Sequence, residues 1–91
     1  MKIKEEYILQ NIADKWIVVD SNARSVNFNR LLSLNSTGKL LWVLLEAGAA
    51  REALVSALTE EYDIDRSRVE SDVDAFLRKL KELECLEREE E

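Results

Sequence analysis

The chain lacks the residues on which most small catalytic and metal-binding sites depend. Its 91 residues include no histidine, one cysteine and two glycines. Without histidine, the commonest metal ligand and general base is absent, and one cysteine forms neither an internal disulfide nor a zinc cluster. Gly38 and Gly48 are too far apart for a phosphate-binding glycine loop. These absences predict a protein with no catalytic residues, no metal site and no cofactor.

The sequence also lacks a membrane-spanning or secretory segment. Its longest apolar run, Leu40 to Leu45, is far shorter than the ~20 residues that cross a bilayer. Lys2 and Lys4 are followed by two glutamates rather than by an apolar stretch, so no signal peptide is predicted. The lone Cys85 suits a reducing compartment and is interpreted as an incidental small apolar residue. We therefore expect a cytoplasmic protein with no membrane partner.

An acidic charge balance limits the partners further. Nineteen acidic and 13 basic residues give a net charge of −6, which disfavours nucleic acid and anionic membranes. With 46% apolar and 35% charged residues, the chain has the composition of a folded domain. The carboxylates lie on polar helix faces or in the tail, where a solvated role is expected. We predict one domain over residues 1–86 and a disordered acidic tail over residues 87–91.

The first third of the chain has the pattern of β-strands. Tyr7–Ile12 and Lys15–Asp20 are rich in β-branched and aromatic residues, and only two residues separate them, which predicts a hairpin. Val26–Asn29 alternates apolar and polar residues, which predicts a half-buried third strand extending to about Leu32. This third strand has two interpretations from its pattern: an open edge, or a strand that is paired or covered within the domain.

After residue 35 the pattern becomes helical. Asn35–Thr37 are all residues that favour a helix N-cap, and the apolar run that follows predicts a helix buried on nearly every side and ending at Gly48. Arg51–Tyr62 has an amphipathic stripe of Ala50, Ala53, Leu54, Ala57, Leu58 and Tyr62. Asp65 can cap a third helix from Arg66 to about Leu83.

The order of these elements predicts an α+β, winged-helix-like fold, in which a three-stranded antiparallel sheet precedes a three-helix bundle. Such a plan also occurs in DNA-binding transcription regulators, and this is the alternative function. Five basic side chains on the third helix are matched by five acidic ones, whereas a DNA-reading helix usually concentrates positive charge.

Two stretches resemble the PqqD family. The run from Leu34 to Gly38, with the leucines and Trp42 that follow, is similar to the family's helix-opening signature. The later spacing is similar as well, and the resemblance covers about residues 7–86. Its members there are Leu54, Leu58, Tyr62, Val69, Glu70, Ser71, Asp72, Val73, Phe76, Leu77 and Leu80. The chain departs from the pattern at Gly38, where alanine is common, and at Glu84-Cys85, where a glycine usually ends the last helix.

The resemblance implies a non-catalytic recognition element for ribosomally made peptides that are later modified. Such a domain binds the leader of a precursor peptide as an extra antiparallel strand and presents it to a tailoring enzyme, often a radical S-adenosylmethionine protein. Strand addition gives backbone affinity, and side-chain pockets give specificity. We expect a monomer or weak homodimer. The implied peptide-binding residues are Val26, Asn27, Phe28, Asn29, Arg30 and Leu31 in the strand, and Val69, Asp72, Val73, Phe76 and Leu77 in the third helix.

The implied helix residues belong to the stripe that must also bury against the other helices. One helix face cannot serve the core and a binding surface equally. We therefore expect the peptide to use the margin of this stripe.

Overall fold

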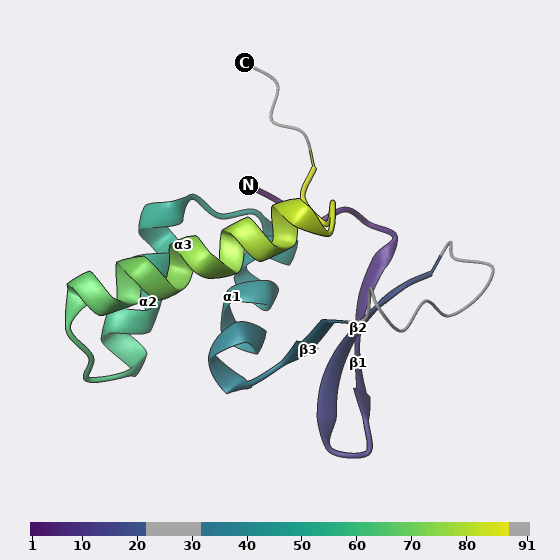
Figure 1. Ribbon diagram of the computed structural model, residues 1–91, viewed down its shortest axis with the longest axis horizontal. Coiled ribbons are helices and arrows are strands. Elements are labelled where there is room, and N and C mark those ends of the chain that lie inside the picture. Colours follow the sequence, from purple (N-terminus) through teal and green to yellow (C-terminus); the bar gives the residue numbers. More distant parts are fainter. Residues whose placement is uncertain (22–31, 88–91) are drawn as a thin grey trace.

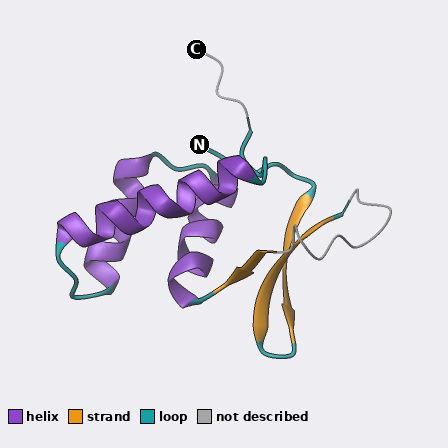
Figure 2. Cartoon of the chain, viewed as in Figure 1, coloured by secondary structure: helices purple, strands orange, loops and turns teal. Residues whose placement is uncertain are grey.

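The computed structural model describes residues 1–21 and 32–87 and has the predicted α+β architecture (Figures 1 and 2). Over these residues, an antiparallel sheet with strand order β1-β2-β3 precedes three helices. The strands are β1 (Tyr7–Ile12), β2 (Lys15–Asp20) and β3 (Leu32–Leu34), and the helices are α1 (Ser36–Ala47), α2 (Arg51–Glu61) and α3 (Arg66–Glu82). No helix in the described ranges is long and apolar enough to cross a membrane.

The β1–β2 hairpin has the bounds that the sequence predicted. Its two-residue turn consists of Ala13 and Asp14, which both have positive φ angles of 52° and 65°. Positive φ at both positions is the mark of a type I′ turn, whose twist matches that of a β-hairpin. The turn places Ile12 opposite Lys15 and thereby sets the register of the whole strand pair.

Strand β3 pairs antiparallel with β2 and leads directly into α1. Trp16 lies opposite Leu34, and Val18 lies opposite Leu32. Val18 and Leu34 are buried, so this face of the sheet packs on the core. The predicted strand over Val26–Asn29 lies outside the described residues, and its expected end near Leu32 coincides with the start of β3.

Helix α1 begins and ends as its sequence predicts. The Asn35 side chain accepts a hydrogen bond of 2.8 Å from the Gly38 N–H, which satisfies a backbone donor of the first turn. Gly48 ends the helix with a φ of 98°, a conformation that glycine adopts without steric cost. The prediction that this helix is buried on nearly every side was wrong at Val43. This residue is 46% exposed, because it lies on the side of the helix away from the core.

The second helix buries a different stripe from the one predicted. Leu54 and Leu58 are buried as expected, but the third buried side chain is Val55, whereas Ala53 is exposed. The spacing alone fits either stripe, and the larger Val55 buries more apolar surface than Ala53 could.

The third helix buries one face along most of its length. Its buried residues are Val69, Val73, Leu77 and Leu80. Asp65 occupies the N-cap position, but its carboxylate makes no capping bond and instead accepts from the Ser67 hydroxyl.

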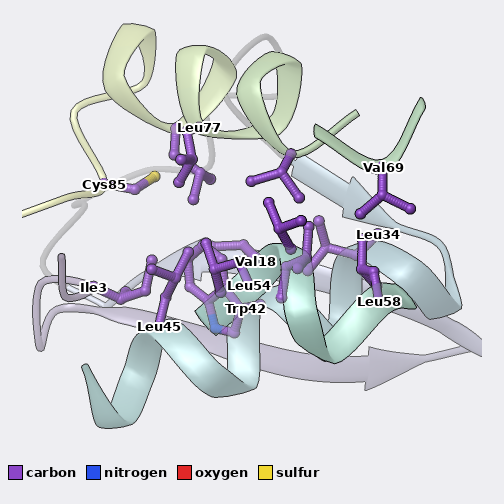
Figure 3. Close-up of a cluster of buried hydrophobic side chains, with 14 residues drawn as sticks. Ile3, Val18, Leu34, Trp42, Leu45, Leu54, Leu58, Val69, Leu77 and Cys85 are labelled. Carbon is purple, nitrogen blue, oxygen red and sulfur yellow. The ribbon is translucent and has the colours of Figure 1, made fainter. Parts of the chain in front are cut away.

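The N-terminal segment Met1–Lys4 completes the core, and the sequence patterns did not predict this. Ile3 is 3% exposed, donates its N–H to Leu45 at 3.0 Å and forms an antiparallel bridge with Leu86. Lys4 donates its N–H to the carbonyl of Cys85, whose side chain is buried in the same cluster (Figure 3). The first and last described segments therefore lie side by side. Of the predicted tail, Glu87 donates its N–H to Lys2, and residues 88–91 lie outside the described residues.

Candidate functional site

The hydrogen-bond pattern of the hairpin determines which residues of β2 bond to β1 and which face β3. Ile12 and Lys15 close the two-residue turn, and Ser21 donates its N–H to Glu6 at 2.7 Å at the far end of the same pairing. In an antiparallel pair the bonded positions alternate along each strand. The odd-numbered residues of β2 therefore bond to β1, and the even-numbered residues face β3.

This alternation leaves one backbone position of β3 pointing out of the sheet. Leu32 and Leu34 lie opposite Val18 and Trp16, at the positions of β2 that face β3. Ser33, between them, directs its N–H and C=O away from β2. Among the described residues no strand pairs with this outer edge of β3, because the strand order ends there. The position can therefore accept a further strand.

An aromatic side chain of α3 lies beside the end of β3. A methyl group on Gly38 would stand 3.4 Å from the Phe76 ring and 3.4 Å from the Leu34 side chain. Leu34, Gly38 and Phe76 thus bring β3, the first turn of α1 and the middle of α3 to one place. Phe76 is only partly buried against the core, so this residue retains some exposed surface.

The predicted helix residues divide into buried and exposed ones. Val69, Val73 and Leu77 are buried, at 1%, 0% and 6% exposure, and belong to the hydrophobic core. Asp72 is exposed and lies 4.0 Å from Arg68 on its own helix. Only Asp72 and Phe76 therefore present side-chain surface, and the three aliphatic residues fix the position of the helix.

The predicted strand residues Val26, Asn27, Phe28, Asn29, Arg30 and Leu31 lie outside the described residues. The described part of this edge begins at Leu32. Sequence reasoning missed Ser33, the one described residue of β3 whose backbone points outward. The outward direction of the Ser33 backbone could have been inferred from the two-residue turn of the hairpin. The turn sets the register of β1 with β2, and this register determines which residues of β2 face β3.

Trp16 occupies the β2 position next to the candidate edge. It lies opposite Leu34, and the Lys39 ammonium stands 3.9 Å from the centre of its ring. A cation over an indole face is attracted by the ring quadrupole. The Trp16 side chain is only partly buried against the core.

The cations at the start of α3 and α2 are largely engaged with carboxylates. Arg51 of α2 binds Asp74 of α3 through two bonds of 2.6 and 3.0 Å. Arg66 of α3 binds Glu52 of α2 and lies 3.5 Å from Glu70. The hydrogen bond from Arg51 lowers the pKa of the Asp74 carboxyl below its ordinary value. This arrangement ties α2 to α3 and pairs Arg66, at the start of the would-be DNA-reading helix, with carboxylates.

The described residues hold no cluster of three or more His, Cys, Asp or Glu side chains that could bind a metal ion.

Comparison with known proteins agrees with this architecture. The model of the family described as coenzyme PQQ synthesis protein D (PqqD) matches residues 6–86. A solved structure of TbiB1 in complex with the TbiA(beta) leader peptide is 32% identical, with full coverage of both chains and a TM-score of 0.77. A lasso peptide synthetase B1 complexed with the leader peptide shares the fold at 23% identity, with 89% of each chain covered and a TM-score of 0.70. The search of curated proteins gave no match. The matches cover nearly the whole chain, which therefore belongs to the PqqD family.

Proposed function

We propose that this chain binds the leader of a ribosomally synthesised precursor peptide by β-strand addition. The observation that carries the proposal is the outer edge of β3, where Ser33 directs its backbone groups outward. The next residue, Leu34, approaches Gly38 from β3 as the partly buried Phe76 does from α3. An extended peptide at this edge gains main-chain hydrogen bonds, and side-chain contacts with α3 provide selectivity. TbiB1 and the lasso peptide synthetase B1 are each found in complex with a leader peptide, which supports a leader peptide as the ligand.

In this proposal the peptide-binding surface combines the edge of β3 with the margin of α3. The strand part is Val26–Leu31 continued by Ser33, and the helix part consists of Asp72 and Phe76. Val69, Val73 and Leu77 act indirectly, since they hold α3 against the core.

The chain itself performs no chemistry in this proposal. It presents the precursor to a separate modifying enzyme, which we take to be of the radical S-adenosylmethionine type often found with PqqD proteins. The absence of histidine from the sequence fits this role. A DNA-binding role is less favoured, because the arginines at the start of α3 are paired with carboxylates and the chain carries a net charge of −6.

The proposal is tested by a matched pair of variants at one position. Ser33→Pro removes the outward N–H but leaves the β2 pairing of Leu32 and Leu34, whereas Ser33→Ala keeps the N–H. With a leader peptide encoded beside this gene, calorimetry should show weaker binding by about tenfold for Ser33→Pro, in line with the loss of a backbone bond and strand geometry. Ser33→Ala should bind like the wild type.

Two results would contradict the proposal. One is equal affinity of Ser33→Pro and wild type while circular dichroism shows both folded. The other is tight binding of duplex DNA that weakens steeply with salt, which would favour the transcription regulator.

A further inference from the structure

Within the described residues the sheet has a second open edge, on β1. Ser21 donates its N–H to Glu6, and Ile12 lies opposite Lys15, so the even-numbered residues of β1 bond to β2. Leu9 and Asn11 therefore direct their backbone N–H and C=O groups away from the sheet. In the described part of the chain no strand pairs with this edge. Figure 1 shows the hairpin extending away from the helices.

This edge lacks the features that normally prevent strands from associating. β1 has the sequence YILQNI and contains neither a charged residue nor a proline. Charged residues and proline are two of the means by which native proteins protect an edge strand from pairing. Ile8 and Ile12 are 41% and 47% exposed on the sheet face opposite the core. The edge thus combines unpaired backbone groups with exposed apolar side chains.

We propose that β1 pairs with β1 of a second copy of this chain, antiparallel and about a two-fold axis at Gln10. An axis perpendicular to the sheet keeps each face continuous, so residues on the same face must lie opposite one another. Centred on Gln10, this register places Leu9 opposite Asn11 of the second copy, so that their outward backbone groups exchange hydrogen bonds. It also places Ile8 beside Ile12 of the second copy.

The partner that best fits this edge is a second copy of the chain, because β1 is complementary to itself: its outward backbone groups and its exposed isoleucines meet the same groups of the other β1. β1 itself is uncharged, so pairing brings no opposing charges together within the strand, although each chain carries −6. Just beyond the strand, Asp14 approaches Glu6 of the second copy, which weakens the association. Six residues a side is also much less than the ~20–30 of a standard interface. The dimer is therefore weak, depends on concentration and is strengthened by salt.

The dimer leaves the proposed peptide edge free. Pairing through β1 gives a continuous sheet with the order β3-β2-β1-β1-β2-β3, so that both copies of β3 remain at the outer ends. Self-association and leader binding therefore use opposite edges, and neither requires the other.

The first test is a site-specific disulfide. In the proposed register Gln10 faces its own copy in a non-hydrogen-bonded pair, where Cα atoms lie ~4.5 Å apart, within the ~4.4–6.8 Å range of disulfides. Gln10→Cys should form a linked dimer in oxidised glutathione at least tenfold faster than Ile8→Cys, which faces Ile12 instead. The native Cys85 is 2% exposed and does not compete. Equal cross-linking rates for the two variants would overturn the register.

The second test measures association by sedimentation equilibrium. Asn11→Pro removes an outward N–H, whereas Asn11→Ala keeps it, so only the proline should raise the dimer dissociation constant, by about tenfold or more. Ile8→Lys should also weaken the dimer, and adding Ile12→Glu to it should restore association, since these positions meet between copies. A monomeric wild type at millimolar concentration, or no rescue by the double variant, would overturn the proposal. If Asn11→Pro does not fold, the comparison of Ile8→Lys with the Ile8→Lys, Ile12→Glu double variant tests the proposal.

Discussion

The ring of Phe76 lies against Gly38, so that α3 meets the first turn of α1 at a position without a side chain. A methyl group there would stand 3.4 Å from ring carbon Cε1. The same methyl group would stand 3.3 Å from the capping oxygen of Asn35. This contact joins the helix cap, the end of β3 and the proposed binding surface. Substitutions of Phe76 and of Gly38 should therefore differ in their effects on leader binding and on the stability of the fold.

Phe76→Ala should weaken leader binding more than it weakens the fold. The ring is only partly buried, so its loss should cost about 1–3 kcal/mol of unfolding free energy, below the range for a fully buried phenylalanine. We expect affinity for the leader peptide to fall by about tenfold or more, because the exposed part of the ring is lost from the surface. Urea unfolding and calorimetry measure the two effects. Unchanged affinity in a folded variant would remove Phe76 from the site.

A Leu58→Ala variant provides the control for this comparison. Leu58 is 2% exposed and belongs to α2, and not to β3 or α3. It should lose about 2–5 kcal/mol of stability, while the folded protein binds the leader with wild-type affinity.

Gly38→Ala should be tolerated and slightly stabilising. Alanine is favoured over glycine in helices by about 0.5–1 kcal/mol, and the neighbours at 3.3–3.4 Å are side-chain atoms that can move by a few tenths of an ångström. A rise in thermal midpoint would agree with the alanine common at this position in the family pattern. A loss of more than ~1 kcal/mol of unfolding free energy would show that the Phe76 and Asn35 side chains cannot move to make room for the methyl group.

Burial separates two neighbouring leucines of α1. Leu45 is fully buried, whereas Leu44 is only partly buried against the core. Leu45→Ala should therefore cost about 2–5 kcal/mol of unfolding free energy, and Leu44→Ala clearly less. Denaturant titration of the two variants checks the order, and equal losses would contradict the orientation of α1.

The Arg51–Asp74 pair should make the free energy of unfolding decrease as the pH falls into the acidic range. The hydrogen bond from Arg51 lowers the pKa of Asp74 in the folded state below its ordinary value of 3.8. The contribution is therefore fully present above the unfolded pKa and is lost as the pH falls through the lower folded pKa. Asp74→Asn should reduce stability at neutral pH by a small amount, because both side chains are more than a third exposed. An acid limb of the same steepness in this variant and wild type would contradict the pairing.

The sequence predicted the fold well where a local pattern determines structure. The hairpin bounds follow from β-branched strands around a two-residue gap, and the Asn35 cap follows from its residue type. The packing of Ile3 could not be predicted in this way, since a four-residue segment has no periodicity. The choice of Val55 over Ala53 depends on where α1 and α3 lie, which the pattern of α2 does not contain.

The site was less predictable for the same reason. Periodicity places Val69, Val73, Phe76 and Leu77 on one face of a helix, but only tertiary packing shows that Phe76 lies at its partly exposed margin. Likewise, the outward direction of the Ser33 backbone requires the register of three strands. Strand alternation alone leaves both directions open.

The most direct test of the central claim is amide hydrogen exchange with and without the leader peptide. A strand added to β3 must accept the outward N–H of Ser33, so its amide should exchange at least about tenfold more slowly in the complex. The outward amides of Leu9 and Asn11 on β1 serve as an internal control and should be unchanged at protein concentrations too low for self-association. Protection of Ser33 alone among these three is the predicted result. Unchanged exchange at Ser33 under saturating leader peptide would contradict strand addition at this edge.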